Sequence, residues 1–265
     1  MAFDDDTGLQ PAGDGRYEGA IEERWWTPRG PLGGYVMAIL LRGILMEIAD
    51  SARQPRSLTV QFLRPPEAGE ITVSATVERT GRSLTNATGR LEQGGRTLAL
   101  ALASLSVPWE SPLLDDAPIP ETEPPLPRAV APRVERDPMP AFLDLVSMQP
   151  RFGTPPFSRA DHALAGGWLG LIEERPVDAL TIAVLADAWF PAPWPRLNAL
   201  APAPTIEMSV YFRSPLPLPD SLLLGRFDSR LVRDGFFDEN GELWAPDGTL
   251  VAQSRQLGLL LGAQV

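Results

Sequence analysis

The sequence predicts an α+β fold made of two copies of one unit, each an apolar helix packed against an antiparallel sheet. Three observations support this. The two ends of the chain share a strand pattern, a proline-rich stretch separates them, and each contains one very apolar, helix-like segment. A chain of 265 residues is long enough for two such units, each with its own core.

The shared strand pattern is an internal repeat. The first copy reads "SLTVQFLRPPEAGEITVSATVER" and the second "EMSVYFRSPLPLPDSLLLGRFDSRLVR". Val60 corresponds to Val210 at a spacing of 150 residues, and Gly89 corresponds to Gly241 at a spacing of 152. Several of these strands alternate apolar with polar or small residues, as a half-buried antiparallel sheet should.

The proline-rich stretch marks the boundary between the copies. Ten prolines fall within residues 108–140, and each fixes φ and lacks an N–H donor. A regular helix or an inner strand is therefore not expected there. We predict a first unit over residues 1–107, a connector over 108–142 and a second unit over 143–265.

Each half also contains one apolar segment with helical character. The segment "GPLGGYVMAILLRGILMEIAD" predicts a buried helix of about 18 residues, entered through Gly33 and Gly34. The segment "PVDALTIAVLADAWFP" predicts a shorter helix, ended by Pro191 and Pro193.

Glycines indicate where the hairpins turn. We place tight turns at Gly94-Gly95 and at Asp247-Gly248. The tripeptide "ENG" at 239–241 also resembles a turn, but its counterpart Gly89 lies in a strand-like run. Gly241 is therefore predicted to be a strand glycine.

Composition excludes several classes of function. The chain has no cysteine and a single histidine, His162, so thiolate metal sites, multi-histidine metal sites and Cys/His nucleophiles are excluded. The formal net charge is −11 and all basic residues are arginine, which argues against nucleic acid as a partner. No apolar run approaches a membrane span, and "MAFDDDTGLQ" does not resemble a signal peptide, so we expect a cytoplasmic protein.

One carboxylate stands out in the second apolar segment. Asp187 interrupts the run "TIAVLADAWFP", and a buried charge without a partner is costly. Either it faces solvent or caps a helix, or it is an acid or base that works in a dry environment.

The order of these motifs resembles the hotdog fold in tandem, as in the double-hotdog acyl-CoA thioesterases that include bacterial thioesterase II. The resemblance covers residues 10–107 and 143–265. The motifs that carry it are "GGYVMA" at 33–38, "FLRPPEAGEI" at 62–71, "LADAWF" at 185–190, "PTIEMSVYFRSP" at 204–215 and "DGTLVAQSRQLG" at 247–258.

The resemblance implies hydrolysis without a covalent intermediate. An Asp, a Thr and a Gln of the second unit hold and activate a water, and they match Asp187, Thr205 and Gln256. A buried carboxylate can serve as general base, and the other two side chains can orient the water. We expect the oxyanion to be bound by N–H groups at the glycine-opened helix start, Gly33 and Gly34.

Each of these residues also has an ordinary structural explanation. Thr205 could be a β-forming residue at a strand start, and Gln256 a polar residue on an outward face. The spacing places Ser104 and Pro55 at the positions of Gln256 and Thr205, and neither could repeat the chemistry. The first helix holds no acid before Glu47. One half should therefore carry the chemistry while the other supports binding.

The resemblance also implies a substrate and residues that could contact it. The expected partner is a small acyl thioester with no cofactor, since coenzyme A is part of the substrate, and double units could associate further. Trp189 and Trp194 could line an acyl channel or simply pack, and Arg82, Arg213 or Arg233 could contact the nucleotide.

Two other functions remain open. One is a hotdog hydratase, which usually needs a catalytic histidine, whereas His162 is expected in a strand before the second helix. The other is a non-catalytic protein that binds acyl thioesters.

Overall fold

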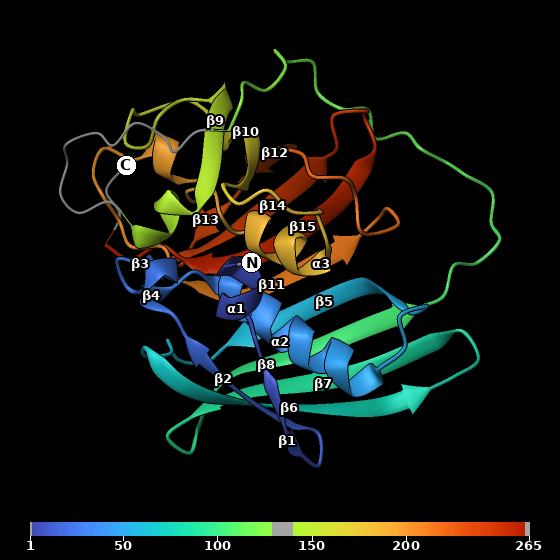
Figure 1. The fold of residues 1–265 in the computed structure, drawn as a ribbon. Coiled ribbons are helices and arrows are strands. Elements are labelled where there is room, and N and C mark those ends of the chain that lie inside the picture. The colour runs from blue at the N-terminus through green and yellow to red at the C-terminus, as the bar shows by residue number, and fades with distance from the viewer. Residues whose placement is uncertain (1, 129–139, 263–265) are drawn as a thin grey trace.

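We describe the protein from a computed structural model, which describes residues 2–128 and 140–262. One antiparallel sheet of 13 strands dominates the fold (Figure 1). In spatial order its main path runs β1 (Gln10–Gly13), β2 (Arg16–Ile21), β6 (Gly69–Thr80), β7 (Leu84–Gln93), β8 (Arg96–Ser106), β5 (Gln54–Phe62), β11 (Thr205–Phe212), β15 (Leu250–Leu259), β14 (Phe236–Trp244), β12 (Leu223–Asp228), β10 (Leu164–Leu171) and β9 (Val146–Gly153).

The remaining elements are short. The thirteenth strand, β13 (Val232–Arg233), pairs with β14, and β3 (Trp26–Thr27) pairs with β4 (Gly30–Pro31). Besides two core helices, the chain forms α1 (Ala2–Asp6) and the 3-10 turns η1 (Glu23–Trp25), η2 (Ala141–Asp144) and η3 (Trp194–Arg196). No helix within the described ranges is long and apolar enough to cross a membrane.

The strand order of the second half mirrors that of the first. The path β2-β6-β7-β8-β5 is followed by β11-β15-β14-β12-β10, so that β5 and β11 lie side by side at the centre. Thr59 of β5 faces Ser209 of β11, its own counterpart 150 residues on, and their hydroxyls lie 2.8 Å apart. A residue that faces its counterpart marks a local two-fold axis, which relates the two halves.

The pairing register corrects one equivalence taken from the sequence. Gly89 faces Ala101 in the first half, and Gly241 faces Ser254 in the second. The spacing is therefore 152 residues for β7 and β14 but 153 for β8 and β15, because the stretch from Gly241 to Ser254 is one residue longer than that from Gly89 to Ala101. Ala103, not Ser104, occupies the position of Gln256.

The predicted hairpin turns are confirmed. Gly94 and Gly95 join β7 to β8 with φ of 56° and 74°, which glycine adopts without strain. Asp247 and Gly248 lie in the turn between β14 and β15, and Gly241 lies within β14 as expected.

The first helix, α2 (Gly33–Ile48), closely follows the prediction. Its apolar side chains are almost fully buried as far as Ile44 and half-buried in the last turn, and it packs against β6, β7 and β8. It ends at Ala49, which adopts the left-handed conformation with φ of 49°. The core of the first half therefore forms between this helix and the sheet.

The second helix, α3 (Ala179–Leu185), is shorter than its sequence suggests. The Asp178 carboxylate accepts the Thr181 N–H at 2.8 Å and caps its start. The helix stops at Leu185, before the prolines that were expected to end it, and Asp187 donates its N–H to the Val184 carbonyl. The tightened last turn directs the chain away from the helix axis.

The two helices meet closely at the start of α2. A Cβ on Gly34 would lie 2.6 Å from the Ala183 carbonyl oxygen and 2.8 Å from that of Val184. Such a contact is possible only for a residue without a side chain. Gly34 therefore sets the distance between the halves at this point.

The proline-rich connector has no helix or strand over residues 107–128, and residues 129–139 lie outside the described range. Figure 1 shows it leaving the end of β8 and looping out and over the second half. There, Trp168 donates its indole N–H to the Glu123 carbonyl at 2.8 Å, and Trp244 donates to the Ala117 carbonyl at 3.2 Å. The connector thus covers two tryptophans of the second half; its exact boundaries at 108 and 142 stay a prediction.

Candidate active site

Asp187 lies in the turn after α3, directly above the start of α2. Its Oδ2 accepts the Gly34 N–H at 2.7 Å, and it also accepts the Gly33 N–H. The side chain is enclosed by protein but keeps a partly exposed surface. An acid from the second half is thus held by the helix start of the first half, where the dipole favours negative charge.

The environment of Asp187 brings its titration close to neutrality. Burial raises the pKa of Asp187 to about 6, while the Gly34 and Gly33 N–H groups oppose the rise. Such a carboxylate is mostly ionised at neutral pH, yet basic enough to accept a proton from a reacting group.

The N–H groups of the two glycines contact Asp187, and the predicted oxyanion role of Gly33 and Gly34 stays a prediction. The Gly34 N–H, expected to bind an oxyanion, is engaged by Asp187, and Gly33 also donates to that carboxylate. An N–H group that donates to a carboxylate has to give up that bond before it can stabilise a developing charge elsewhere. In this structure both N–H groups donate to the acid.

Thr205 and Gln256 meet on the inner face of the sheet. The Gln256 amide Nε2 donates a hydrogen bond to Thr205 Oγ1, and Gln256 is 8% exposed. A register shift between Thr205 and Glu207 in β11 marks a β-bulge. A bulge re-aims the side chains beside it, so strand position alone did not decide that these two would touch.

The hydrogen bonds of the three predicted catalytic residues form two separate sets. One joins Thr205 with Gln256, and the other joins Asp187 with the start of α2. The link between the sets comes from a residue that sequence reasoning missed. Glu239 of β14 lies directly across the ladder from Gln256, and it interacts electrostatically with Asp187.

Glu239 is a buried acid without an ion-pair partner among the described residues. It is 7% exposed, and its Oε2 accepts the Ala192 N–H at 2.6 Å. Burial raises the pKa of Glu239 to about 8; the Ala192 N–H opposes this, and the charge of Asp187 adds to it. The strand alternation could have revealed it, because Glu239 is in phase with Phe237 and Leu243.

Comparison with known families agrees with this arrangement. The family model described as the acyl-CoA thioesterase C-terminal domain matches residues 116–260, which is more than half of the chain. The model described as the acyl-CoA thioesterase N-terminal domain matches residues 22–106. The chain belongs to the acyl-CoA thioesterase family.

Several solved structures are similar to this chain. A conserved protein of unknown function with a hot dog fold from Alicyclobacillus acidocaldarius is 29% identical, with a TM-score of 0.88 over 100% of this chain and 99% of that one. A protein from Thermobifida fusca, provisionally assigned as a thioesterase II, is 28% identical, with a TM-score of 0.84 over 98% of both chains. An acyl-CoA thioesterase II, TesB2, from Mycobacterium marinum is 19% identical and shares the fold, with a TM-score of 0.77 over 100% of both. A search of curated proteins gave no match.

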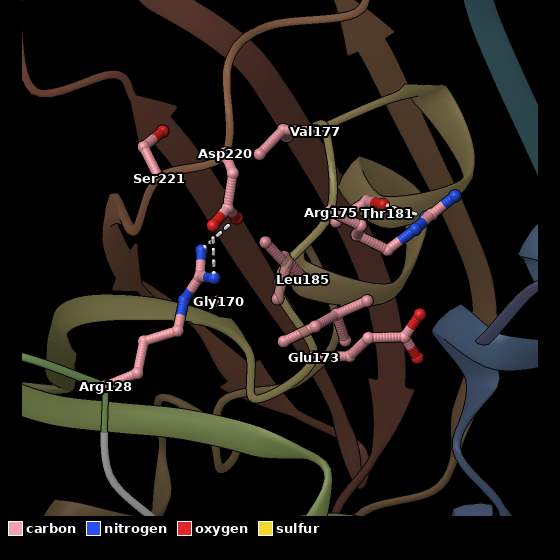
Figure 2. A pocket seen from close by; sticks show the side chains of 10 residues that line it. Arg128, Gly170, Glu173, Arg175, Val177, Thr181, Leu185, Asp220 and Ser221 are labelled. Carbon is pink, nitrogen blue, oxygen red and sulfur yellow. Dashed lines mark hydrogen bonds and ion pairs between the residues drawn. The ribbon is translucent and has the colours of Figure 1, made fainter. Parts of the chain in front are cut away.

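Two hollows of this family member lie away from the predicted site residues. A small one lies beside α3, where Arg128 and Asp220 form an ion pair and Arg175 lies near Thr181 (Figure 2). A larger one, of about 470 Å³, lies between α1, Trp25 and residues 171–173. Neither of these two is lined by Asp187, Thr205, Gln256 or Glu239.

Other residues singled out in this thioesterase sequence have ordinary surroundings. His162 was expected in a strand, but this is wrong: it lies exposed in a bend before β10, because the strand begins only at Leu164. Trp189 packs against Phe227 at 6.3 Å between ring centroids.

Trp194 and the three arginines considered for nucleotide binding also lie in surroundings that indicate no special role. Trp194 donates its indole N–H to the Ala201 carbonyl. Arg82, Arg213 and Arg233 are all exposed. Within the described residues, no group of three or more His, Cys, Asp or Glu side chains could hold a metal ion.

Proposed function

We propose that this thioesterase family member hydrolyses acyl-CoA, or a related acyl thioester, to the free acid and the thiol. We further propose that its sheet is two hotdog units side by side, each around one helix. The family match supports thioester hydrolysis in general, and the mirrored strand order supports the tandem arrangement.

In the proposed reaction a water attacks the thioester carbonyl while Asp187 accepts its proton. The carbon–oxygen bond forms, the tetrahedral intermediate collapses, and the carbon–sulfur bond breaks to release the thiolate. Asp187 then returns its proton to the sulfur or to solvent. Thr205 and Gln256 hold the attacking water, with the Gln256 carboxamide fixed by its bond to the threonine hydroxyl.

The observation that carries this proposal is the state of Asp187. The carboxylate is enclosed, held by two N–H groups, and still partly exposed on one side. With a pKa of about 6 it combines ionisation at neutral pH with useful basicity. A carboxylate serving only to cap a helix would face water and gain nothing from burial.

The proposed reaction uses no metal and no cofactor, because the carboxylate supplies the base and coenzyme A arrives as part of the substrate. The partner is a small acyl thioester. Association of double units through the edge strands β1 and β9 also stays a prediction. Gly33 and Gly34 hold the base in this scheme, and the oxyanion donors are not assigned to them.

The decisive experiment measures thiol release from acetyl-, hexanoyl- and palmitoyl-CoA by the wild type and Asp187→Asn. The asparagine keeps the size of the side chain and an acceptor oxygen for Gly34. We expect kcat to fall about 10²- to 10⁴-fold while thioester binding is retained. Binding of thioesters by the wild type without turnover would instead favour a non-catalytic acyl-thioester-binding protein.

A further inference from the structure

Glu239 occupies a position where the fold does not require an acid. Its counterpart in the first half, at the β7–β14 spacing of 152 residues, is Ala87, which is fully buried. The same scaffold therefore accepts a methyl group at this place. A carboxyl group buried there costs free energy, so its presence needs an explanation beyond folding.

The first contact of Glu239 fixes the segment that follows Asp187. Oε2 accepts the Ala192 N–H at 2.6 Å, and Ala192 stands between Pro191 and Pro193. Proline rings limit backbone rotation on both sides, so that holding Ala192 restrains the whole turn. That turn begins at Asp187, five residues earlier.

The second neighbour of Glu239 is Gln256. The two residues are directly opposite on β14 and β15, and both side chains are buried on the inner face. Directly opposite residues of an antiparallel pair have Cβ atoms about 5 Å apart, which two long side chains easily bridge. Since the Gln256 amide N–H₂ donates to Thr205, its carboxamide oxygen is the end turned toward other donors.

We propose that Glu239 is a positioning residue for hydrolysis: in its neutral form it anchors the Asp187 turn through Ala192 and fixes the orientation of the Gln256 carboxamide. This inference rests on the proposed function. It makes Glu239 the connection between the two hydrogen-bonded sets of the site. When the carboxyl ionises, it can no longer donate to an amide oxygen, and a second negative charge stands near Asp187.

The charged groups around Glu239 agree with a neutral carboxyl at physiological pH. Asp187 in the turn after α3, Asp228 at the end of β12 and Asp238, its neighbour in β14, all interact electrostatically with it. Asp228 is paired with Arg226 at 3.4 Å, and Asp238 with Arg255 at 3.1 Å. These acids raise the pKa of Glu239 further beyond the effect of burial.

The test compares Glu239→Gln with Glu239→Ala in the full chain, using acyl-CoA hydrolysis from pH 5 to 10. Glutamine keeps an acceptor for Ala192 and a donor for Gln256, so we expect kcat at pH 7 to stay within about fivefold of wild type. Alanine loses both, and we expect kcat to fall up to about 100-fold with KM little changed. The wild-type rate should rise through about pH 6 and fall through about pH 8, and the fall should vanish in Glu239→Gln.

The proposal is overturned if Glu239→Ala matches the wild type, if glutamine is as impaired as alanine, or if the alkaline fall persists in Glu239→Gln. Asp187→Asn, measured alongside, separates this inference from the proposed function. Activity that survives Asp187→Asn refutes the function itself, whereas its loss together with a fully active Glu239→Ala refutes only the role of Glu239. Should the alanine variant not fold, the pH profile of the glutamine variant still decides.

Discussion

The two halves share a backbone plan but differ in what they place on the inner face of the sheet. Corresponding positions hold polar groups in the second half and apolar ones in the first: Glu239 against Ala87, Gln256 against Ala103, and Thr205 against Pro55. Even the β-bulge beside Thr205 has a counterpart beside Pro55. The fold therefore tolerates apolar residues at all three places, and the polar set is the one that we propose for hydrolysis.

The helices of the two halves also differ in whether they place apolar or polar groups over the sheet. In the first half α2 runs over β6, β7 and β8 and covers the inner face with apolar side chains. In the second half α3 stops at Leu185, and the turn that follows brings Asp187 and Ala192 over the sheet. A shortened helix thus leaves room for polar groups that a full helix would cover.

The largest effect should come from giving the first half the acid of the second. Ala87→Glu places a carboxyl where no partner like the Ala192 N–H awaits it. We expect the free energy of unfolding to fall by about 3–5 kcal/mol, as for other uncompensated buried charges. Urea denaturation measures this. The mirror change, Glu239→Ala, is the control and should not destabilise the fold; equal tolerance of both changes would contradict the comparison.

Next in size is the contact between the halves at the start of α2. Gly34→Ala forces a methyl group against two carbonyl oxygens of α3, and overpacking of this kind costs about 1–3 kcal/mol. Gly33→Ala instead meets Asp187 Oδ2 at 2.9 Å, and a side-chain oxygen can shift. Thermal unfolding should show the larger loss for Gly34→Ala, while kcat should fall in both. A Gly33→Ala protein with full activity would show that the position of Asp187 is not critical.

A smaller effect is expected for the threonine hydroxyl. Thr205→Val keeps the shape of the side chain but removes the acceptor for Gln256. Losing one hydrogen bond of about 1 kcal/mol should lower kcat about five- to tenfold. Thr59→Val is the matched control in the equivalent strand of the first half, and steady-state kinetics should leave it at the wild-type rate. Equal losses in both variants would point to a general effect on the sheet.

The smallest effect is on stability as pH rises. The folded pKa of Glu239 is raised to about 8 from an ordinary value of 4.5, so its stabilising contribution is complete below pH 4.5 and is lost progressively as pH rises from there through 8. Between pH 7 and 9 this should remove about 1 kcal/mol of unfolding free energy. Glu239→Gln should flatten that slope, whereas Ala87→Ser in the first half should leave it unchanged.

Much of the fold could be predicted from local patterns. The apolar run after Gly34, the glycine turns and the spacing of 150 residues all depend on neighbours in the sequence or on repetition. Prediction from local patterns fails at the counterpart of Gln256, which is Ala103 and not Ser104. One extra residue in the second hairpin shifts every later equivalence between the halves. His162 was misplaced for a similar reason, since strand ends depend on pairing partners.

Part of the candidate site could likewise be predicted from the sequence, and part could not. Asp187 could be named in advance because a carboxylate is unusual in an apolar run, whereas Thr205 and Gln256 were named only through the family resemblance. Glu239 was missed, although its phase with Phe237 and Leu243 in the predicted strand already pointed to the buried face. The register of β14 with β12 and β15 then places it opposite Gln256 on that face.

The sequence by itself determined the repeat, the two apolar helices, the turns and the types of residue available for chemistry, since these follow from periodicity and local backbone preference. Only the tertiary structure decided that the start of α2 holds Asp187, that Thr205 bonds to Gln256, and that a second acid lies between them. Those contacts join residues from distant strands and from opposite halves. Their energies depend on burial and geometry that exist only once the whole sheet has assembled.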